Sequence, residues 1–510
     1  MEKYNVTQSL RIPVADKHLS AEISGDFTLP DYQPEIKRLL RVSASVLPPS
    51  KYVSERGAEF AGNIDYYVLY TGSDNELYCA PLTSEYKINL PLDASEYDKD
   101  GSIGNFVGGI SLFPDMISGR VTAPRKLNIK CRLKGRGQVL GDLELSGGRA
   151  DGESEIQTLI STMDAVKREW SVSDPLVIHD EMICDNKDGD VRVIMADGKV
   201  LVSEIVPAEG RVNCRGDVYL KLLLCRESEG RPYSVMRKLA FSHAVEVTGA
   251  NVGSSATARG TVSEMGITVE DGRVDIDVTA LIECEACCCD RISFVKDVYS
   301  TERVTENSYS SYEVPIGGVA STGNFTLSDS KSLDEVGIAH GACVVDICGV
   351  AYPEEYDLES GRCALLGQAR FSLLLEKDGE YSTAEIELPF TYKTGASGDF
   401  DRAMFSCEII SSRARIDGER IGIDAEVGVS GVASAHEKES ILSAVGFGNE
   451  LEKHRGELII CYPGGDDSLW SVAKRYGADI DRLAESNGIE GDAPADSRES
   501  IEKVKYLVIQ

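Results

Sequence analysis

The chain has 510 residues, with 53 Lys and Arg against 84 Asp and Glu, which gives a formal net charge of −31. A chain this acidic is unsuited to binding nucleic acid or anionic lipid, because both require clustered basic side chains. Hydrophobic residues make up 42% of the chain, so we expect folded domains, and the length suits three or four of them.

The first residues are polar and no apolar segment follows them, so we expect no secretory signal. The longest aliphatic runs, such as residues 222–225, are far too short to cross a bilayer. The sequence therefore predicts a cytoplasmic protein without direct membrane insertion. In a reducing cytosol its 14 cysteines should be free thiols, most of them buried.

Three segments of the chain resemble one another. Each contains a glycine followed by a strand-like apolar run, at Gly62, Gly216 and Gly367, and these glycines lie 154 and 151 residues apart. An aromatic residue follows each glycine after 23 to 25 residues: Tyr86, Phe241 and Phe390. A second block recurs at intervals of 147 residues, at 126–129, 273–276 and 420–423.

Apolar residues within these blocks alternate with polar ones, most clearly from Val274 to Cys288, which is typical of a strand with one buried face. Asp197-Gly198 and Asp378-Gly379 are candidate hairpin turns. We therefore predict a mainly β protein, with three repeated antiparallel, sandwich-like modules at residues 1–148, 149–303 and 304–450.

Two segments of the modules have helical periodicity. Pro34 suits a first helical position, with Leu39 and Leu40 on one face of the helix that would follow. A stronger amphipathic helix is expected over residues 153–169, before the second module. Its apolar stripe consists of Ile156, Leu159, Ile160, Met163 and Val166.

The character of the chain changes after residue 450, where we expect a separate small α+β domain at 455–510. Residues 458–462 read as a strand, two short helices follow, and residues 504–509 read as the last strand. Asp467 is the expected cap of the first helix, and Gly477 suits its left-handed end. The order is strand, helix, helix, strand.

This C-terminal segment resembles a LysM domain in its Gly-Asp turn, its Leu-Trp pair and its Ala-Lys-Arg-Tyr-Gly helix end. The resemblance implies a core that contains Trp470, Val472, Ala473, Tyr476 and Leu483. It also implies that two loops bind a partner or an N-acetylglucosamine polymer: Gly465, Asp466, Asp467, Ser468 and Leu469 in the first, Ile489 and Glu490 in the second. An acidic stretch from 490 to 503 replaces the family's usual turn before the last strand.

Enzyme motifs are missing from the sequence: there is no Walker loop, no Gly-x-Ser-x-Gly elbow, and the six histidines are scattered singly. Two groups imitate metal sites. Cys284, Cys287, Cys288 and Cys289 crowd together, but on a strand they would face opposite ways. Glu96, Asp98, Asp100 and Gly101 imitate an EF-hand loop but lack its last ligand. We expect no catalytic residue, metal or cofactor.

The modules resemble the SPOCS family of endospore formers in three segments: Phe27-Thr28-Leu29-Pro30, the run from Gly62 to Leu69-Tyr70, and residues 295–301. SPOCS repeats that end in LysM imply a non-enzymatic scaffold of spore coat and cortex morphogenesis. Its expected partner is a SpoIVA-like coat ATPase at the forespore surface in the mother cell. The alternative is a protein that binds peptidoglycan or chito-oligosaccharide through LysM.

Overall fold

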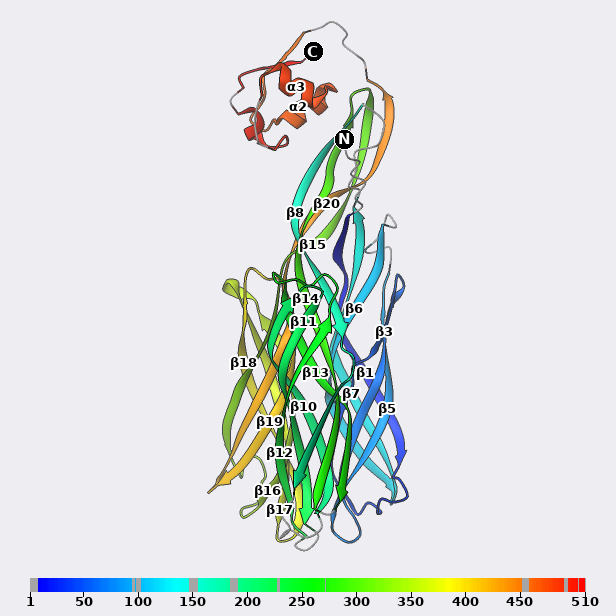
Figure 1. Ribbon diagram of the computed structural model, residues 1–510, viewed down its shortest axis with the longest axis vertical. Helices are drawn as coiled ribbons and strands as arrows, with labels where there is room; N and C mark the ends of the chain where they lie inside the picture. The colour runs from blue at the N-terminus through cyan, green and yellow to red at the C-terminus, as the bar shows by residue number, and fades with distance from the viewer. Residues whose placement is uncertain are drawn as a thin grey trace.

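The computed structural model of the chain has an elongated β-rich body, a stalk of long strands and a small helical domain at the tip of the stalk (Figure 1). Among the residues it describes, no helix has the length and apolar character needed to span a bilayer. Those residues are 8–93, 97, 102–145, 155–183, 191–226, 230–270, 272–451, 458–489, 494–502 and 504–509.

Two sheets that share one core form the first third of the body. One sheet has the order β1-β7-β6, and in the other β4 pairs with β2, β3 and β5. Side chains from both sheets, among them Phe60 and Leu127, are fully buried together. The strands are β1 (Gln8–Thr28), β2 (Arg38–Val46), β3 (Ser50–Ser54), β4 (Gly57–Thr71), β5 (Leu77–Pro91), β6 (Ile103–Ala123) and β7 (Lys126–Leu145).

The middle third repeats this arrangement with one addition. β11 pairs with β10 and β12, β14 pairs with β13 and β9, and a single bridge between Val200 and Gly260 joins the two groups into one seven-stranded sheet. The added strand, β8, pairs with the second half of β14. The strands are β8 (Ile156–Val172), β9 (Leu176–Ile183), β10 (Val191–Ala208), β11 (Arg211–Arg226), β12 (Pro232–Glu246), β13 (Ser255–Glu270) and β14 (Arg273–Ser300).

The last third again has two three-stranded sheets, β15-β20-β19 and β16-β17-β18, packed on one core. The prediction of a mainly β protein with antiparallel, sandwich-like sheets is therefore confirmed. The strands are β15 (Arg303–Ser332), β16 (Cys343–Asp357), β17 (Arg362–Lys377), β18 (Glu380–Ser397), β19 (Arg402–Asp417) and β20 (Arg420–Glu450), with a short 3₁₀ turn, η1 (Glu359–Gly361), before β17.

The sequence repeats have a direct structural meaning. Each repeated glycine lies opposite its aromatic residue on the neighbouring strand: Gly62 with Tyr86, Gly216 with Phe241, and Gly367 with Phe390. A side chain on the glycine would lie 2.5–3.0 Å from the ring, so the ring covers bare backbone. The second block opens the equivalent strands β7, β14 and β20.

The helix predicted over residues 153–169 is wrong, because the described part of this segment forms strand β8. β8 pairs with β14 along its whole length, from Ile156 opposite Ser300 to Val172 opposite Glu283. Ile160, assigned to the helical stripe, is 56% exposed. The helical periodicity of this segment did not decide its structure, because the backbone groups at the edge of the long strand β14 need hydrogen-bonding partners and β8 supplies them.

Two smaller predictions also fail. Leu39 and Leu40 lie on strand β2 and not on a helix after Pro34. Asp197-Gly198 lies inside strand β10, where a side chain on Gly198 would come within 2.9 Å of Met265. That glycine therefore serves close packing. By contrast, Asp378 and Gly379 have positive φ angles of 53° and 81° and form the predicted hairpin turn between β17 and β18.

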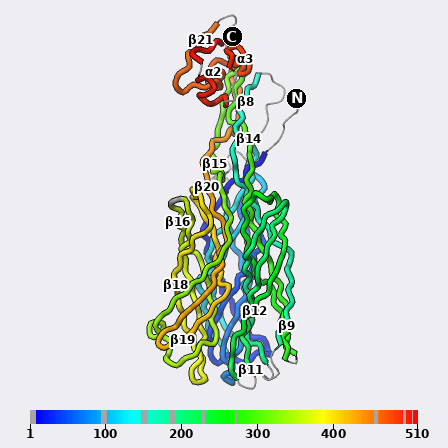
Figure 2. The backbone as a smooth tube through the Cα atoms, turned by 60° about the vertical axis from the view of Figure 1, so that its left-hand side comes forward, coloured from blue at the N-terminus to red at the C-terminus, as the bar shows by residue number. Residues whose placement is uncertain are grey.

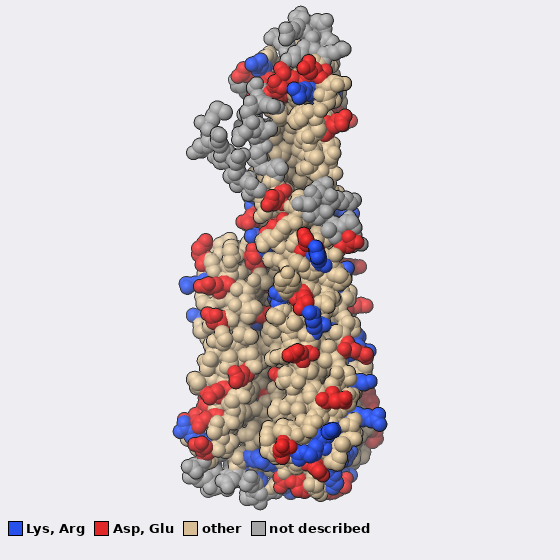
Figure 3. Space-filling model, turned by 90° about the vertical axis from the view of Figure 1, so that its right-hand side faces the viewer, with Lys and Arg blue, Asp and Glu red and all other residues tan. Residues whose placement is uncertain are grey.

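The three thirds of the body meet around buried ion pairs. Asp346 on β16 is 3% exposed and accepts from Arg41 on β2 at 2.6 Å, and its other oxygen lies 2.8 Å from Lys221 on β11. One carboxylate thus joins all three thirds. Arg11 on β1 similarly contacts Glu169 on β8 at 2.8 Å. The visible outer face of the body carries acidic and basic side chains interspersed (Figure 3).

The stalk consists of residues 156–165, 290–300, 303–314 and 437–450, which continue β8, β14, β15 and β20 beyond the body (Figure 2). Its upper core contains Ile156, Val295 and Val298, with Leu442 and Val445 packed against them. Farther down, Ala165, Phe294 and Val314 pack against Leu10 and Leu143 of the first third. The stalk is therefore a direct extension of the two later thirds.

The domain at the tip, residues 458–509, is called the tail domain below. Its strands pair antiparallel, with Ile460 opposite Val508. The predicted order strand, helix, helix, strand is confirmed. The elements are β21 (Ile459–Cys461), α2 (Leu469–Tyr476), α3 (Ile480–Ser486), the 3₁₀ turn η2 (Arg498–Ile501) and β22 (Leu507–Ile509).

Candidate functional site

Helix α2 of the tail domain begins with a reciprocal cap. The Ser468 hydroxyl accepts from Ser471 N–H at 3.1 Å, and the Ser471 hydroxyl accepts from Ser468 N–H at 2.8 Å. Gly477 ends the helix with φ of 60°, as predicted. Asp479 then caps helix α3 by accepting from the N–H of Asp481 and Arg482.

Asp467 does not cap α2, contrary to the prediction from its position. Its carboxylate instead accepts from Gly464 N–H at 2.8 Å and pairs with Arg475. The hydrogen bond from Arg475, with that from Gly464, lowers the pKa of Asp467. Ser468 caps the helix because it stands directly before the first helical residue, Leu469. Asp467 instead joins Gly464 and Arg475 across the first loop.

Of the predicted core residues, Trp470, Val472, Ala473 and Leu483 are each at most 5% exposed. The prediction for Tyr476 is wrong, because its side chain is 40% exposed. It is the last residue of α2. Asn487 contributes to the core through its amide, which exchanges two hydrogen bonds with the backbone of Val508, at 2.6 and 2.9 Å.

The predicted loop residues divide into two groups. Gly465 and Asp466 are exposed in a turn, whereas Ser468 and Leu469 are buried at 6% and 7% exposure. Buried residues cannot form the predicted contact surface. Ile489 is partly buried against the core, and Glu490 lies outside the described residues.

The start of helix α2 is occupied by the chain itself. Leu469 N–H donates to the Ser500 hydroxyl at 3.1 Å, and Trp470 N–H donates to the Ala495 carbonyl at 2.9 Å. The first amides of a helix are otherwise free to bind a ligand. The described part of the second loop, residues 494–502, therefore occupies the backbone amides of Leu469 and Trp470. These amides lie next to the first loop, which was expected to bind the ligand.

Asp297 is the central polar contact between the stalk and the tail domain. It accepts from Trp470 Nε1 at 2.8 Å, Lys474 Nζ at 2.7 Å and the Tyr309 hydroxyl at 2.7 Å. Burial acts to raise the pKa of Asp297, but the hydrogen bonds from Lys474, Trp470 and Tyr309 together hold it below its usual value. The carboxylate is thus charged, and both of its oxygen atoms accept hydrogen bonds.

Tyr299, two residues farther along β14, adds an aromatic contact. Its ring meets Trp470 edge to face with centroids 4.9 Å apart, and its hydroxyl donates to the Ala478 carbonyl at 2.7 Å. Burial raises the pKa of Tyr299 above its ordinary value, so the phenol stays protonated and can donate. Lys296 reaches Asp496 of the second loop at 2.7 Å.

This docking site was missed from the sequence. Residues 295–301 were recognised as a SPOCS-like segment, yet nothing in the sequence indicated that they face α2. The signal was present in part, since Trp470 and Lys474 are four residues apart and therefore share one face of a helix. Trp470 consequently belongs both to the core of the tail domain and to its interface with the stalk.

The outer face of β21 and β22 carries exposed apolar side chains. Leu458, Ile460 and Tyr462 alternate with core-facing residues and are 64%, 49% and 70% exposed. Tyr506 is 49% exposed, and its ring lies 6.3 Å from that of Tyr462. We call these four residues the tyrosine face. Exposed apolar groups gathered on so small a domain are typical of an interaction surface.

Comparison with known families agrees with this geometry. The family described as the SipL, SPOCS domain matches residues 191–270, and the LysM domain family matches residues 465–494. The chain carries a SPOCS domain and a LysM domain. The search of curated proteins found no match. SPOCS and LysM domains are binding domains, so the chain fits a sporulation protein with a module of the peptidoglycan-binding type.

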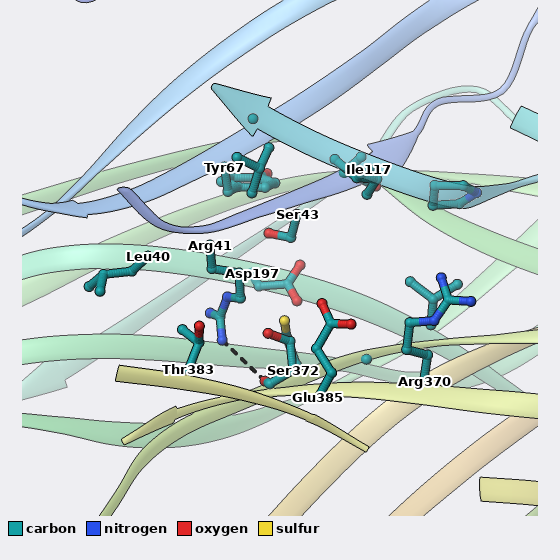
Figure 4. A pocket seen from close by; sticks show the side chains of 18 of the residues that line it. Leu40, Arg41, Ser43, Tyr67, Ile117, Asp197, Arg370, Ser372, Thr383 and Glu385 are labelled. Carbon is teal, nitrogen blue, oxygen red and sulfur yellow. Dashed lines mark hydrogen bonds between the residues drawn. The ribbon is translucent and has the colours of Figure 1, made fainter. Parts of the chain in front are cut away.

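A cavity of about 440 Å³ lies where the SPOCS domain meets the first and last thirds of the body (Figure 4). Arg41 points toward it and donates to the Ser372 carbonyl at 3.3 Å, while Asp346 neutralises its charge. Burial and the nearby charge of Asp197 raise the pKa of Tyr67 to about 12. These groups can hydrogen-bond a small polar molecule, and the described residues that line the cavity include no histidine.

The cysteine cluster is mostly core. Cys284, Cys287 and Cys288 are buried and Cys289 is exposed on strand β14. In the described part of the chain no group of three metal-ligating side chains is close enough to hold an ion. The imitation of an EF-hand at Glu96, Asp98, Asp100 and Gly101 lies outside the described residues.

Proposed function

We propose that this protein is a non-enzymatic scaffold of endospore coat and cortex morphogenesis. In this proposal its LysM domain captures a SpoIVA-like coat ATPase, and the SPOCS-type body holds that domain away from the surface on which the protein assembles. The proposed location is the mother-cell cytoplasm at the forespore surface. The resemblance to SipL, the SpoIVA-interacting protein, supports the choice of partner.

The observation that carries the proposal is the tyrosine face at the tip of the stalk. The stalk contacts Trp470, Lys474 and Ala478 on the helical side of the LysM domain. Leu458, Ile460, Tyr462 and Tyr506 lie on the other side of its sheet and are exposed. A protein partner would bury these side chains, and tyrosine-rich patches favour protein partners.

Binding of peptidoglycan or chito-oligosaccharide is the second candidate, supported by the LysM match and by the exposed turn at Gly465 and Asp466. Against it stand the amides of Leu469 and Trp470, which already have partners in the second loop. The two candidates therefore predict different contact surfaces on one small domain.

Capture of purified SpoIVA by the full-length protein tests the proposal. Tyr462→Ser combined with Tyr506→Ser should lower capture at least tenfold, the effect expected for losing two interface aromatics. Tyr52→Ser is the matched control, because Tyr52 is 71% exposed on β3 of the body. Equal capture by all three proteins would contradict the tyrosine face as the contact surface.

Sedimentation with purified peptidoglycan separates the second candidate from the first. Saturable binding that free chito-oligosaccharide abolishes, and that Asp466→Lys weakens while the tyrosine variants do not, would favour glycan binding. Absence of retention of SpoIVA by the wild-type protein would contradict the scaffold proposal itself.

A further inference from the structure

Two thiols lie in direct contact in the middle third of the body. Cys214 on β11 and Cys284 on β14 have their sulfur atoms 3.6 Å apart and are 0% and 2% exposed. Both belong to the core between the two groups of strands that form the middle third. We propose that Cys214 and Cys284 are a site of disulfide formation that, under oxidising conditions, covalently joins the two faces of this sandwich, whereas in a reducing cytosol both remain thiols.

The geometry favours a bond between these two residues. A disulfide requires sulfur atoms about 2.0 Å apart, so the two sulfur atoms, which lie 3.6 Å apart, must approach each other by about 1.6 Å. The two strands are not neighbours in a ladder: β11 pairs with β10 and β12, whereas β14 pairs with β13, β9 and β8. The bond would therefore link opposite faces of the core, the arrangement that stabilises immunoglobulin domains.

The other two thirds of the body have no thiol pair at the corresponding positions. Cys214 stands two residues before the repeated glycine, where the first and last thirds have Phe60 and Leu365. Cys284 stands eleven residues after the start of the second block, where they have Gly137 and Gly431. In the first and last thirds these two positions therefore hold a large apolar residue and a glycine, whereas in the middle third they hold two cysteines.

The reaction is thiol–disulfide exchange with a small disulfide such as oxidised glutathione. One cysteine thiolate attacks the small disulfide, forms a mixed disulfide and releases one small thiolate. The second cysteine thiolate then attacks the mixed disulfide, forms the Cys214–Cys284 bond and releases the second small thiolate. The two protons lost by Cys214 and Cys284 end on the two small thiols, and the small disulfide is reduced. Since both cysteines are buried, exchange requires an open state of the sandwich and should be fastest during folding.

Refolding of the denatured full-length protein in a glutathione redox buffer, followed by alkylation and peptide mass spectrometry, tests the proposal. We expect a linked Cys214–Cys284 peptide, a loss of two thiols, and a thermal midpoint several degrees above that of the reduced protein. Native protein in the same buffer should form the link much more slowly.

Matched variants separate this pair from the other cysteines. Cys214→Ala and Cys284→Ala should each abolish the link and the rise in midpoint, whereas Cys131→Ala, which changes an equally buried thiol of the first third, should leave both unchanged. Refolded protein in which Cys214 and Cys284 are both alkylated would overturn the proposal. So would a different dominant pair, or a link that lowers the midpoint.

Discussion

The junctions of this molecule differ in how deeply their central carboxylate is buried. Asp346, at the meeting point of the three thirds of the body, has 1% of its side chain exposed and faces two cations. Asp297, where the LysM domain meets the stalk, has 16% exposed and faces one cation and neutral donors. We therefore expect the body to depend more strongly on its central carboxylate than the docking of the LysM domain depends on Asp297.

Trp470→Ala should have the largest effect, because Trp470 serves both the LysM core and the stalk contact. The expected loss is roughly 3–5 kcal/mol, comparable to the whole stability of so small a domain. The domain should unfold while the body remains folded. Trp470→Phe, which keeps the ring volume better but removes the donor to Asp297, should leave the domain folded and its contact with the stalk weaker.

Fluorescence distinguishes these outcomes, because the chain has two tryptophans. In a Trp170→Phe background, Trp470 is the remaining reporter, and its emission should be that of a buried indole. An exposed-type emission in the folded wild-type domain would show that the docked arrangement does not persist in solution.

Asp346→Asn should destabilise the body by about 3 kcal/mol, because Arg41 and Lys221 would keep their charges without a carboxylate in the buried junction. Urea unfolding followed by circular dichroism measures the change. The matched control is Glu204→Gln, since Glu204 pairs with Arg215 on the surface, with both side chains at least 52% exposed. If both variants lowered the free energy of unfolding equally, burial of the ion pair would not explain its contribution to stability.

Asp297→Asn should weaken LysM docking by about 1–2 kcal/mol, since a charged acceptor of several hydrogen bonds is lost. The low pKa of Asp297 gives the sign of the pH dependence. Its contribution is complete above its usual pKa and is lost as pH falls through the folded value. Protease sensitivity of the LysM domain should therefore differ between wild type and variant at pH 7, and the difference should shrink below about pH 4.

Asp467→Ala should have the smallest effect, below about 1 kcal/mol, because Asp467 pairs with the half-exposed Arg475 on the surface. Thermal unfolding of this variant should nearly match the wild type, and SpoIVA capture should be unchanged if the tyrosine face is the contact. Reduced SpoIVA capture by a folded Asp467→Ala variant would instead indicate that the first loop contacts the partner.

Local patterns predicted much of the chain correctly. Alternation predicted the antiparallel strands, and the glycine and aromatic repeats marked positions that lie opposite each other, as at Gly216 and Phe241. Helical spacing and Gly477 predicted both LysM helices. The module boundaries and the assignment of binding loops remain predictions.

Sequence alone determined the strand-rich fold, its repetition and the LysM segment, because these depend on periodicity and turn residues within short stretches. Only the tertiary structure decided that residues 156–172 form a strand, since the hydrogen-bonding edge they complete lies more than a hundred residues away on β14. It also decided that Asp297, Tyr299 and Trp470 form one contact. Contacts between distant residues depend on how whole sheets pack, and no local pattern encodes that.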